Sequence, residues 1–298
     1  MSNPAETGSL LSERALVVVT ACQASDLPVL QITAQKLAEN VRLKSLHVIA
    51  PNADCARIRD CLGGTASVIA EDDFIPGMTP DELRKLPRPQ FAKFPKAVGW
   101  YFQQLLKLQF AFQNPEDDFY LIWDADTVPL RPLHFFDDAG RMLLTKAQEF
   151  HPEYFETYQR LFQEPANREF SCIAQHMVVQ KSVAREMLEQ IQQRIPGSEN
   201  WAWKIMRHLP AHRPDEGDNC FSEYETYGHY LKNHYPDRVR FIERRWLREG
   251  AQFTNGWIPN AEHLQQLGQQ YDYVAFERVS KTWLQWSKNR LKQTLKRR

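Results

Sequence analysis

The sequence predicts an α/β protein in which helices flank a mostly parallel central sheet. Two observations predict this class. Short apolar runs typical of buried strands, at 15–20, 46–50 and 119–123, alternate with segments of helical length. Breaks such as Pro51-Asn52 and Gly63-Gly64 separate these units. This alternation favours a sheet built from parallel strands with helices on its faces.

The elements are expected in the following order. Strands are expected at 15–20, 46–50 and 66–70, with helices between them at about 28–40 and 54–62. After these come a proline-rich segment at 71–98, a buried helix at 100–112 and a strand at 119–123. Strands at 141–145, 172–180 and 238–242 and helices at 183–195, 201–209 and 222–232 make up the second half. The aromatic and acidic stretch 148–170 is expected to shape an acceptor site. We assign 1–14 to a flexible leader, 15–275 to a single domain and 276–298 to a basic amphipathic C-terminal helix.

Composition narrows the class of protein. The chain of 298 residues is 43% hydrophobic, which is enough for a sizeable core. Its 37 basic residues balance 37 acidic ones, which argues against a nucleic-acid binder. The five cysteines are odd in number and form no CxxC pair, which argues against a disulfide framework and against a thiolate zinc site. We therefore expect a cytoplasmic protein.

The most informative segment is 119–130, Phe-Tyr-Leu-Ile-Trp-Asp-Ala-Asp-Thr-Val-Pro-Leu. A buried strand delivers Asp124 and Asp126 to its carboxyl end, the edge at which open α/β sheets bind ligands. Two carboxylates one residue apart can share one hard cation, directly or through water. Mn²⁺ or Mg²⁺ held there would bridge the protein to the diphosphate of a nucleotide-sugar donor and neutralise the departing nucleotide. The structural alternative is an aspartate that only begins a polar turn.

A buried helix with Leu105-Leu-Lys-Leu108, a short loop and then the strand that ends in Asp124-Ala-Asp126 form an order that resembles GT-A glycosyltransferases. The sequence also contains four motifs, Gly99-Trp-Tyr-Phe-Gln-Gln-Leu-Leu-Lys107, Trp123-Asp-Ala-Asp-Thr-Val-Pro-Leu130, Gln175-His-Met177 and Ser222-Glu-Tyr-Glu-Thr-Tyr-Gly228. Together they more closely resemble an uncharacterised bacterial glycosyltransferase-like family associated with surface polysaccharides. The likeness covers roughly residues 15–250. It implies a GT-A-like, Rossmann-related fold, a metal-binding DxD motif and transfer of a hexose-like sugar to a glycan or lipid-linked acceptor.

Two further residues are candidates for donor binding. Lys107, on the helix before the DxD strand, would place an ammonium near the donor diphosphate, although a lysine extending from a buried helix explains it equally well. His176 interrupts an apolar strand and would contact donor or acceptor, against the alternative of a hydrogen-bonded core histidine. Core packing explains Trp100 and its aromatic neighbours, so they are left out of the predicted site.

The catalytic candidates are Glu223 and Glu225. Inversion of anomeric configuration by direct displacement needs a carboxylate base, and inverting GT-A enzymes commonly supply it from the start of a late helix, which Ser222-Glu-Tyr-Glu resembles. Ser222 and Glu225 have the spacing of a capping box, in which the Glu225 carboxylate would bond the backbone amide of Ser222. Glu223 is therefore the preferred base, and its structural alternative is a favourable interaction with the helix dipole.

Two other functions stay open. Asp124-Ala-Asp-Thr-Val128 also fits the nucleophile motif of haloacid-dehalogenase-like phosphatases, with Asp124 as nucleophile and Gly217-Asp218 as a later acidic element. That motif normally opens its domain, whereas more than a hundred patterned residues precede it here. A catalytically silent nucleotide-sugar-binding protein is the third hypothesis.

The C-terminal residues predict a membrane contact. Residues 281–298 carry seven basic side chains and no acidic one, together with Trp283, Trp286, Leu291 and Leu295. A basic helix with apolar anchors can lie on an anionic membrane, and a solvated terminal helix is the alternative. We expect peripheral attachment at the inner membrane face. No apolar stretch approaches the roughly 20 residues that a membrane-spanning helix needs.

Overall fold

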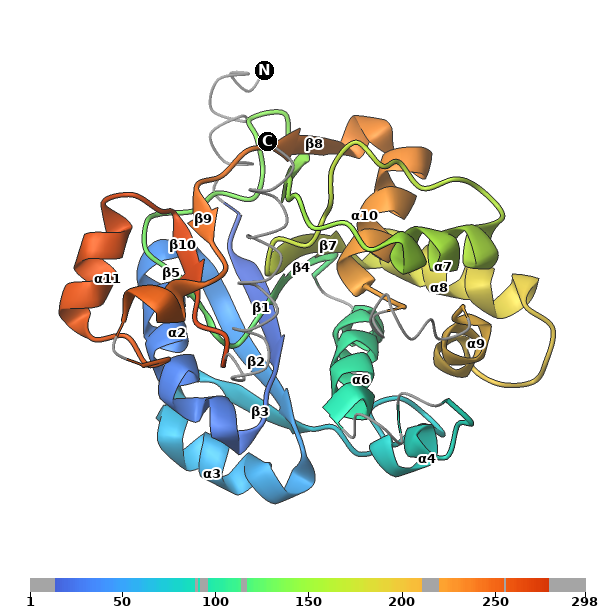
Figure 1. Cartoon of the computed structure of the whole chain (residues 1–298), viewed down its shortest axis with the longest axis horizontal. Helices are drawn as coiled ribbons and strands as arrows, with labels where there is room; N and C mark the ends of the chain where they lie inside the picture. The colour runs from blue at the N-terminus through green and yellow to red at the C-terminus, as the bar shows by residue number, and fades with distance from the viewer. Residues whose placement is uncertain are drawn as a thin grey trace, which may run out of the picture.

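A five-stranded sheet forms the centre of the molecule (Figure 1). The computed structural model describes residues 14–88, 91, 96–113, 117–210, 220–254 and 256–278. The sheet has the order β3-β2-β1-β4-β7, with β1 Leu16–Ala21, β2 Leu43–Ala50, β3 Ser67–Ala70, β4 Phe119–Trp123 and β7 His176–Gln180. The first four strands run parallel, and β7 is antiparallel to β4. The predicted α/β class with a mostly parallel sheet is confirmed.

Helices cover both faces of this sheet. The helices α2 (Leu27–Asn40) and α3 (Asn52–Leu62) lie on one side, and α6 (Lys96–Gln109), α8 (Lys181–Arg194) and α10 (Glu223–His234) lie on the other (Figure 1). The remaining helices are α4 Pro80–Arg84, α7 Pro152–Phe162, α9 Trp201–His208 and α11 Ala261–Gly268. None of the helices in these described ranges is both long and apolar enough to cross a lipid bilayer.

The two central strands are buried along almost their whole length. All six residues of β1 are buried, as are four of the five residues of β4, which explains their continuous apolar sequences. From β1 the chain crosses to β2 on one side, and β4 later pairs with β1 on the other, with Val17 opposite Tyr120 and Val19 opposite Ile122. The strand order therefore reverses between β1 and β4, which is where open α/β sheets bind ligands.

Two small sheets complete the strands. The first joins β5 (Thr127–Pro129), β10 (Tyr273–Ala275) and β9 (Trp246–Leu247), and the second pairs β6 (Met142–Thr145) with β8 (Val239–Ile242). Strand β10 is antiparallel to β5, and the amide of Phe276 donates to the carbonyl of Asp126 at 2.8 Å. Pairing with β10 thus brings the segment after residue 275 beside the DxD turn.

Some expectations need correction. The strand expected at 172–180 begins only at His176, because Gln175 has a left-handed backbone (φ 64°) that interrupts an extended chain. Residues 276–278 follow β10 without helical structure. Residues 1–13 of the expected leader and 279–298 of the expected tail lie outside the described residues.

Candidate active site

A cavity of about 370 Å³ opens at the reversal point between β1 and β4. Its walls come from the ends of β1 and β4, from α6, from the first turn of α10 and from the segment after β10. The lining residues are Ala21, Asp26, Trp100, Gln103, Gln104, Lys107, Asp124, Ala125, Asp126, Glu149, Tyr154, Ile173, Gln175, Ser222, Glu223, Tyr224, Arg248 and Glu277. All four motifs thus contribute polar residues to one cavity, and residues outside the motifs, among them Asp26 and Glu277, add further charged groups.

A tight turn fixes the two aspartates of the DxD motif. The amide of Asp124 donates to the carbonyl of Gln175 at 3.0 Å, and the amide of Thr127 donates to the carbonyl of Asp124 at 3.0 Å. The indole nitrogen of Trp123 donates to the carbonyl of Thr127 at 2.6 Å. Both carboxylates line the cavity, and both side chains are partly buried.

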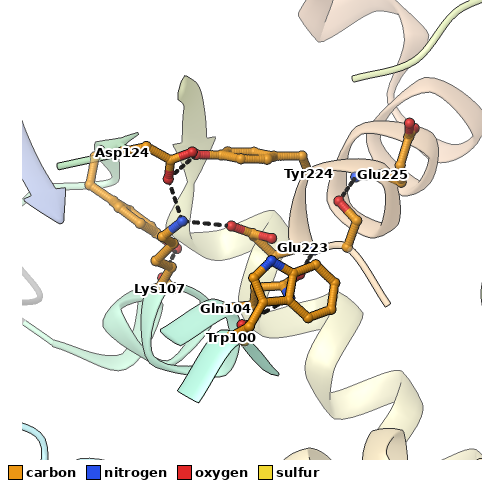
Figure 2. Close-up of polar contacts among 9 residues, drawn as sticks. Trp100, Gln104, Lys107, Asp124, Glu223, Tyr224 and Glu225 are labelled. Carbon is orange, nitrogen blue, oxygen red and sulfur yellow. Dashed lines mark hydrogen bonds and ion pairs between the residues drawn. The ribbon is translucent and has the colours of Figure 1, made fainter. Parts of the chain in front are cut away.

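Lys107 connects this turn to α10, as Figure 2 shows. Its Nζ lies 2.5 Å from Asp124 Oδ1 and 2.9 Å from Glu223 Oε1, and the side chain is only 3% exposed. The hydroxyl of Tyr224 donates to the same Asp124 oxygen at 2.9 Å. The amide of Glu223 donates to Gln104 Oε1 at 3.2 Å. Asp124 Oδ1 is therefore engaged by two protein donors, while Oδ2 faces no protein donor among the described residues.

Burial and charge shift the pKa values of this network. Burial disfavours the charged ammonium of Lys107 and by itself would lower its pKa. The carboxylates of Asp124 and Glu223 have the larger combined effect and raise the pKa of Lys107. Burial raises the pKa of Glu223, which the Lys107 ammonium partly opposes. Lys107 is consequently a fixed cation, and Glu223 takes up a proton more readily than an exposed glutamate does.

The cavity carries an excess of acidic groups. Six carboxylates line it, against the two cations Lys107 and Arg248. Arg248 is itself paired with Glu149 and, at 2.7 Å, with Glu277 Oε1. Burial and then the nearby carboxylates, Glu277 first, raise the pKa of Asp126 to about 8. The described protein groups thus supply too little positive charge to favour the ionised form of Asp126, which is the electrostatic setting that a hard divalent cation fits.

Glu225 lies apart from the cavity. Figure 2 shows Glu223 pointing toward Lys107 and Glu225 pointing away from it. Ser222 caps α10 as predicted, because its Oγ accepts from the amide of Glu225 at 3.2 Å. The Glu225 carboxylate does not return to the Ser222 amide, however, and instead accepts from Ser171 Oγ at 2.5 Å and from the amide of Cys172 at 3.2 Å. We therefore do not retain Glu225 as a candidate base.

His176 is a core residue that does not line the cavity. Its ring stacks on Trp123 with centroids 5.0 Å apart, and its Nε2 lies 3.4 Å from Thr145 Oγ1. Burial, with a smaller effect of Arg244, lowers its pKa well below the ordinary value. The neutral, stacked ring matches the structural alternative, so we do not retain His176 as a donor contact.

Sequence reasoning missed several lining residues. Trp100, which was assigned to the core, borders the cavity. The stretch 148–170, which was expected to shape an acceptor site, contributes Glu149 and Tyr154 without either residue having been singled out. The signal for Trp100 was its place on the helix that carries Lys107, seven residues before it. Asp26 and Glu277 gave no local signal, because each reaches the cavity only through the folding of distant strands.

The fold and the cavity define an α/β protein with an acid-rich cavity at the point where the strand order of its sheet reverses. The chain belongs to a family of unknown function (DUF6492), whose sequence profile matches residues 19–255. No curated protein sequence matches the chain.

Several solved glycosyltransferase structures are similar to this chain. One is the galactosyltransferase LgtC in complex with donor and acceptor sugar analogues, with 12% identity, a TM-score of 0.45, and coverage of 90% of this chain and 89% of that one. The mouse xyloside xylosyltransferase 1 has 12% identity, a TM-score of 0.39, and coverage of 88% and 97%. The glycosyltransferase GlyE of Streptococcus pneumoniae TIGR4 has 12% identity, a TM-score of 0.40, and coverage of 91% and 56%.

Proposed function

We propose that this protein is a metal-dependent glycosyltransferase that uses a nucleotide-sugar donor. The observation that carries the proposal is the pair Asp124 and Asp126, held by a tight turn in an acid-rich cavity at the reversal point of the sheet. A donor diphosphate and an acidic protein site repel each other unless a divalent cation lies between them. The excess of carboxylates over cations in the cavity therefore supports a donor that arrives with Mn²⁺ or Mg²⁺.

The aspartates differ in their roles. Asp126 and the free Oδ2 of Asp124 would hold the cation, which neutralises the charge that develops on the departing nucleoside diphosphate. Lys107 and Tyr224 fix Asp124 through its other oxygen, so that the carboxylate cannot rotate away. Lys107 also adds positive charge on the side of the cavity next to α10.

Glu223 is the residue that we assign as general base. It lines the cavity, Lys107 orients its Oε1, and its raised pKa suits proton uptake from an acceptor hydroxyl. A base on the face opposite the leaving group produces inversion at the anomeric carbon. The acceptor that we propose, a glycan or lipid-linked glycan of a bacterial surface polysaccharide, rests on the resemblance of the four sequence motifs.

Metal-dependent nucleotide binding tests the central claim. Isothermal titration of the protein with uridine, guanosine, adenosine and cytidine diphosphates, each with and without Mn²⁺, should show Mn²⁺-dependent binding of at least one. Asp124→Asn and Asp126→Asn should each weaken it by about tenfold or more, because each removes an anionic ligand. Asp60→Asn on the exposed face of α3 is the matched control and should bind normally. Equal Mn²⁺-dependent binding of the nucleoside diphosphate by Asp126→Asn and Asp60→Asn would contradict the proposed metal site.

Turnover separates transfer from silent binding and from phosphatase chemistry. Release of the same nucleotide from its sugar conjugate should require Mn²⁺ or Mg²⁺, whereas hydrolysis of simple phosphate esters with a trapped aspartyl intermediate at Asp124 would indicate a phosphatase. With an acceptor present, Glu223→Gln should reduce turnover by about 10²-fold while donor binding persists. A product that keeps the donor's anomeric configuration would reject direct displacement.

A further inference from the structure

A second group of ligand-type side chains lies in the core on the far side of the first turns of α10. Cys172 comes from the segment before β7, and Glu225 and His229 come from α10, where a spacing of four residues puts them on one face. One potential ligand atom from each lies within 4.8 Å of the other two. Cys172 and Glu225 are 1% exposed, and His229 is completely buried. None of the three lines the candidate active site.

Hydrogen bonds satisfy only part of this cluster. Glu225 Oε1 accepts from Ser171 Oγ at 2.5 Å, and Oε2 accepts from the amide of Cys172 at 3.2 Å. His229 Nε2 lies 2.9 Å from Glu225 Oε2, but neither nitrogen of the imidazole has a hydrogen-bond partner of acceptable geometry. Buried polar groups in folded proteins are almost always hydrogen-bonded, so an imidazole that lies beside a carboxylate and a thiol without a hydrogen bond points to a missing ligand.

A glycine in α10 permits the close approach of the thiol. A Cβ added at Gly228 would lie 2.5 Å from Cys172 Sγ and 2.9 Å from Cys172 Cβ, which real Cβ atoms do not tolerate. Glycine is disfavoured inside a helix, so its presence here is explained by the space that the cysteine needs. Glycine at position 228 thus weakens the helix slightly but lets the Cys172 thiol approach α10 next to Glu225 and His229.

We propose that Cys172, Glu225 and His229 bind a zinc ion that ties α10 to the segment before β7. A thiolate, a carboxylate and an imidazole are ligands that zinc accepts together, whereas Mg²⁺ and Ca²⁺ require oxygen. The charges of one thiolate and one carboxylate balance Zn²⁺, which a fully buried site demands. The fourth position of the tetrahedron falls to a water or hydroxyl oxygen. The absence of a CxxC pair, which argued against a thiolate zinc site, does not bear on a single cysteine joined by residues of a distant helix.

The position of this ion gives it a role. The segment from Cys172 continues to Ile173 and Gln175, and α10 begins with Glu223 and Tyr224, all of which line the active-site cavity. A zinc ion between the two elements would hold both walls in register. It would do so from outside the cavity, where it meets no substrate.

Zinc content and cobalt spectra test the proposal on the full-length protein. Protein purified without chelator should contain about one zinc per chain, and the double variant Asp124→Asn, Asp126→Asn should retain it, because the two metal sites are separate. Reconstitution with Co²⁺ should give a thiolate-to-metal charge-transfer band in the near ultraviolet, which an all-oxygen site cannot produce.

Two cysteine variants make the test specific. Cys172→Ser should lose the zinc and the charge-transfer band, and Cys61→Ser, which changes an exposed cysteine, should keep both. The cobalt spectrum of the wild-type protein does not depend on whether Cys172→Ser folds. Folded wild-type protein without zinc and without a charge-transfer band in excess Co²⁺ would overturn the proposal, as would a Cys172→Ser variant that keeps its zinc.

Discussion

Lys107 is the residue on which the electrostatics of the cavity depend. Its ammonium is almost fully buried between Asp124 and Glu223, which come from two elements that are far apart in the sequence. Without it, two carboxylates would face each other in a poorly solvated space. The sequence offered two interpretations of Lys107, a phosphate contact and a lysine extending from a buried helix. The structure shows a third, an ion pair that joins β4 to α10.

Replacing Lys107 by methionine should therefore destabilise the protein by about 3–5 kcal/mol, because it leaves buried carboxylates without their counter-charge. Urea unfolding followed by circular dichroism measures this change. Lys36→Met is the matched control, since Lys36 pairs with Glu39 on the exposed face of α2 and should cost about 0.5 kcal/mol or less. A loss no larger in Lys107→Met than in Lys36→Met would contradict the structural role.

Glu71 gives the folded protein a pH dependence. It follows β3, where burial, with a smaller effect of Asp72 and Asp54, raises its pKa to about 7. The folded state therefore favours the protonated carboxyl. The stability that this contributes is complete below the ordinary pKa of 4.5 and is lost as the pH rises through about 7.

The free energy of unfolding of the wild-type protein should thus fall between about pH 5 and pH 8 relative to that of Glu71→Gln, which does not titrate. The side chain is partly exposed, so solvent screening limits the difference to about 1 kcal/mol. Urea unfolding at several pH values measures both curves. Parallel curves for the two proteins would show that Glu71 has no such effect.

At the scale of elements, the first half of the chain was readable from its sequence. The strands β1 to β4 and the helices α2, α3 and α6 appear where apolar periodicity and turn residues indicated. The later elements were harder to predict. The strands β5 and β10 have three residues each and are defined by pairing with each other, which local patterns cannot reveal.

The candidate site divides in the same way. Asp124 and Asp126 were visible because one strand presents both of them. Glu223 was visible because a cap at Ser222 marks the start of its helix. Asp26 and Glu277 lie in segments far from these motifs and reach the cavity through long-range packing. No local pattern in the sequence could therefore predict them as site residues.

The short helical turn Gly250–Phe253 packs closely on β10. A Cβ at Gly250 would lie within 3 Å of the backbone carbonyl of Ala275 and of the side chains of Val274 and Phe276. Backbone cannot move aside as a flexible side chain can, so this contact explains why glycine occupies the position.

Gly250→Ala should therefore destabilise the protein by about 1–3 kcal/mol, the range for overpacking a well-packed core. Gly64→Ala is the control, because a Cβ at Gly64 meets nothing within 4 Å. We expect its effect to stay within about 0.5 kcal/mol. Differential scanning calorimetry compares the two, and equal midpoints would show that β10 yields to the added methyl group.

At the scale of the whole molecule, a net charge of zero conceals an uneven distribution. Acidic groups gather in the cavity, and the last 18 residues hold seven basic residues and no acidic one. Those residues lie outside the described structure, so the membrane contact proposed for them rests on their sequence. Such a contact would bring the cavity near a lipid-linked acceptor.

A chain that ends at Arg278 retains every described element, and it should keep the melting temperature of the full chain. It should also lose binding to vesicles that contain anionic lipid, because seven basic side chains are absent. Vesicle sedimentation at low and physiological salt measures this, with vesicles of neutral lipid as control. Equal sedimentation of both chains with anionic vesicles would exclude the proposed attachment.

The pairing of β5 with β10 also determines when the cavity can be completed during synthesis of the chain. The carbonyl of Asp126 receives its hydrogen bond from Phe276, about half of the chain later. In a nascent chain that has emerged only as far as the DxD turn, the carbonyl of Asp126 therefore lacks its hydrogen-bond donor, the amide of Phe276. Contacts of such long sequence separation form late and slowly. The cavity consequently takes its final form in the last steps of folding, because the unfinished polypeptide on the ribosome lacks the segment that carries Glu277.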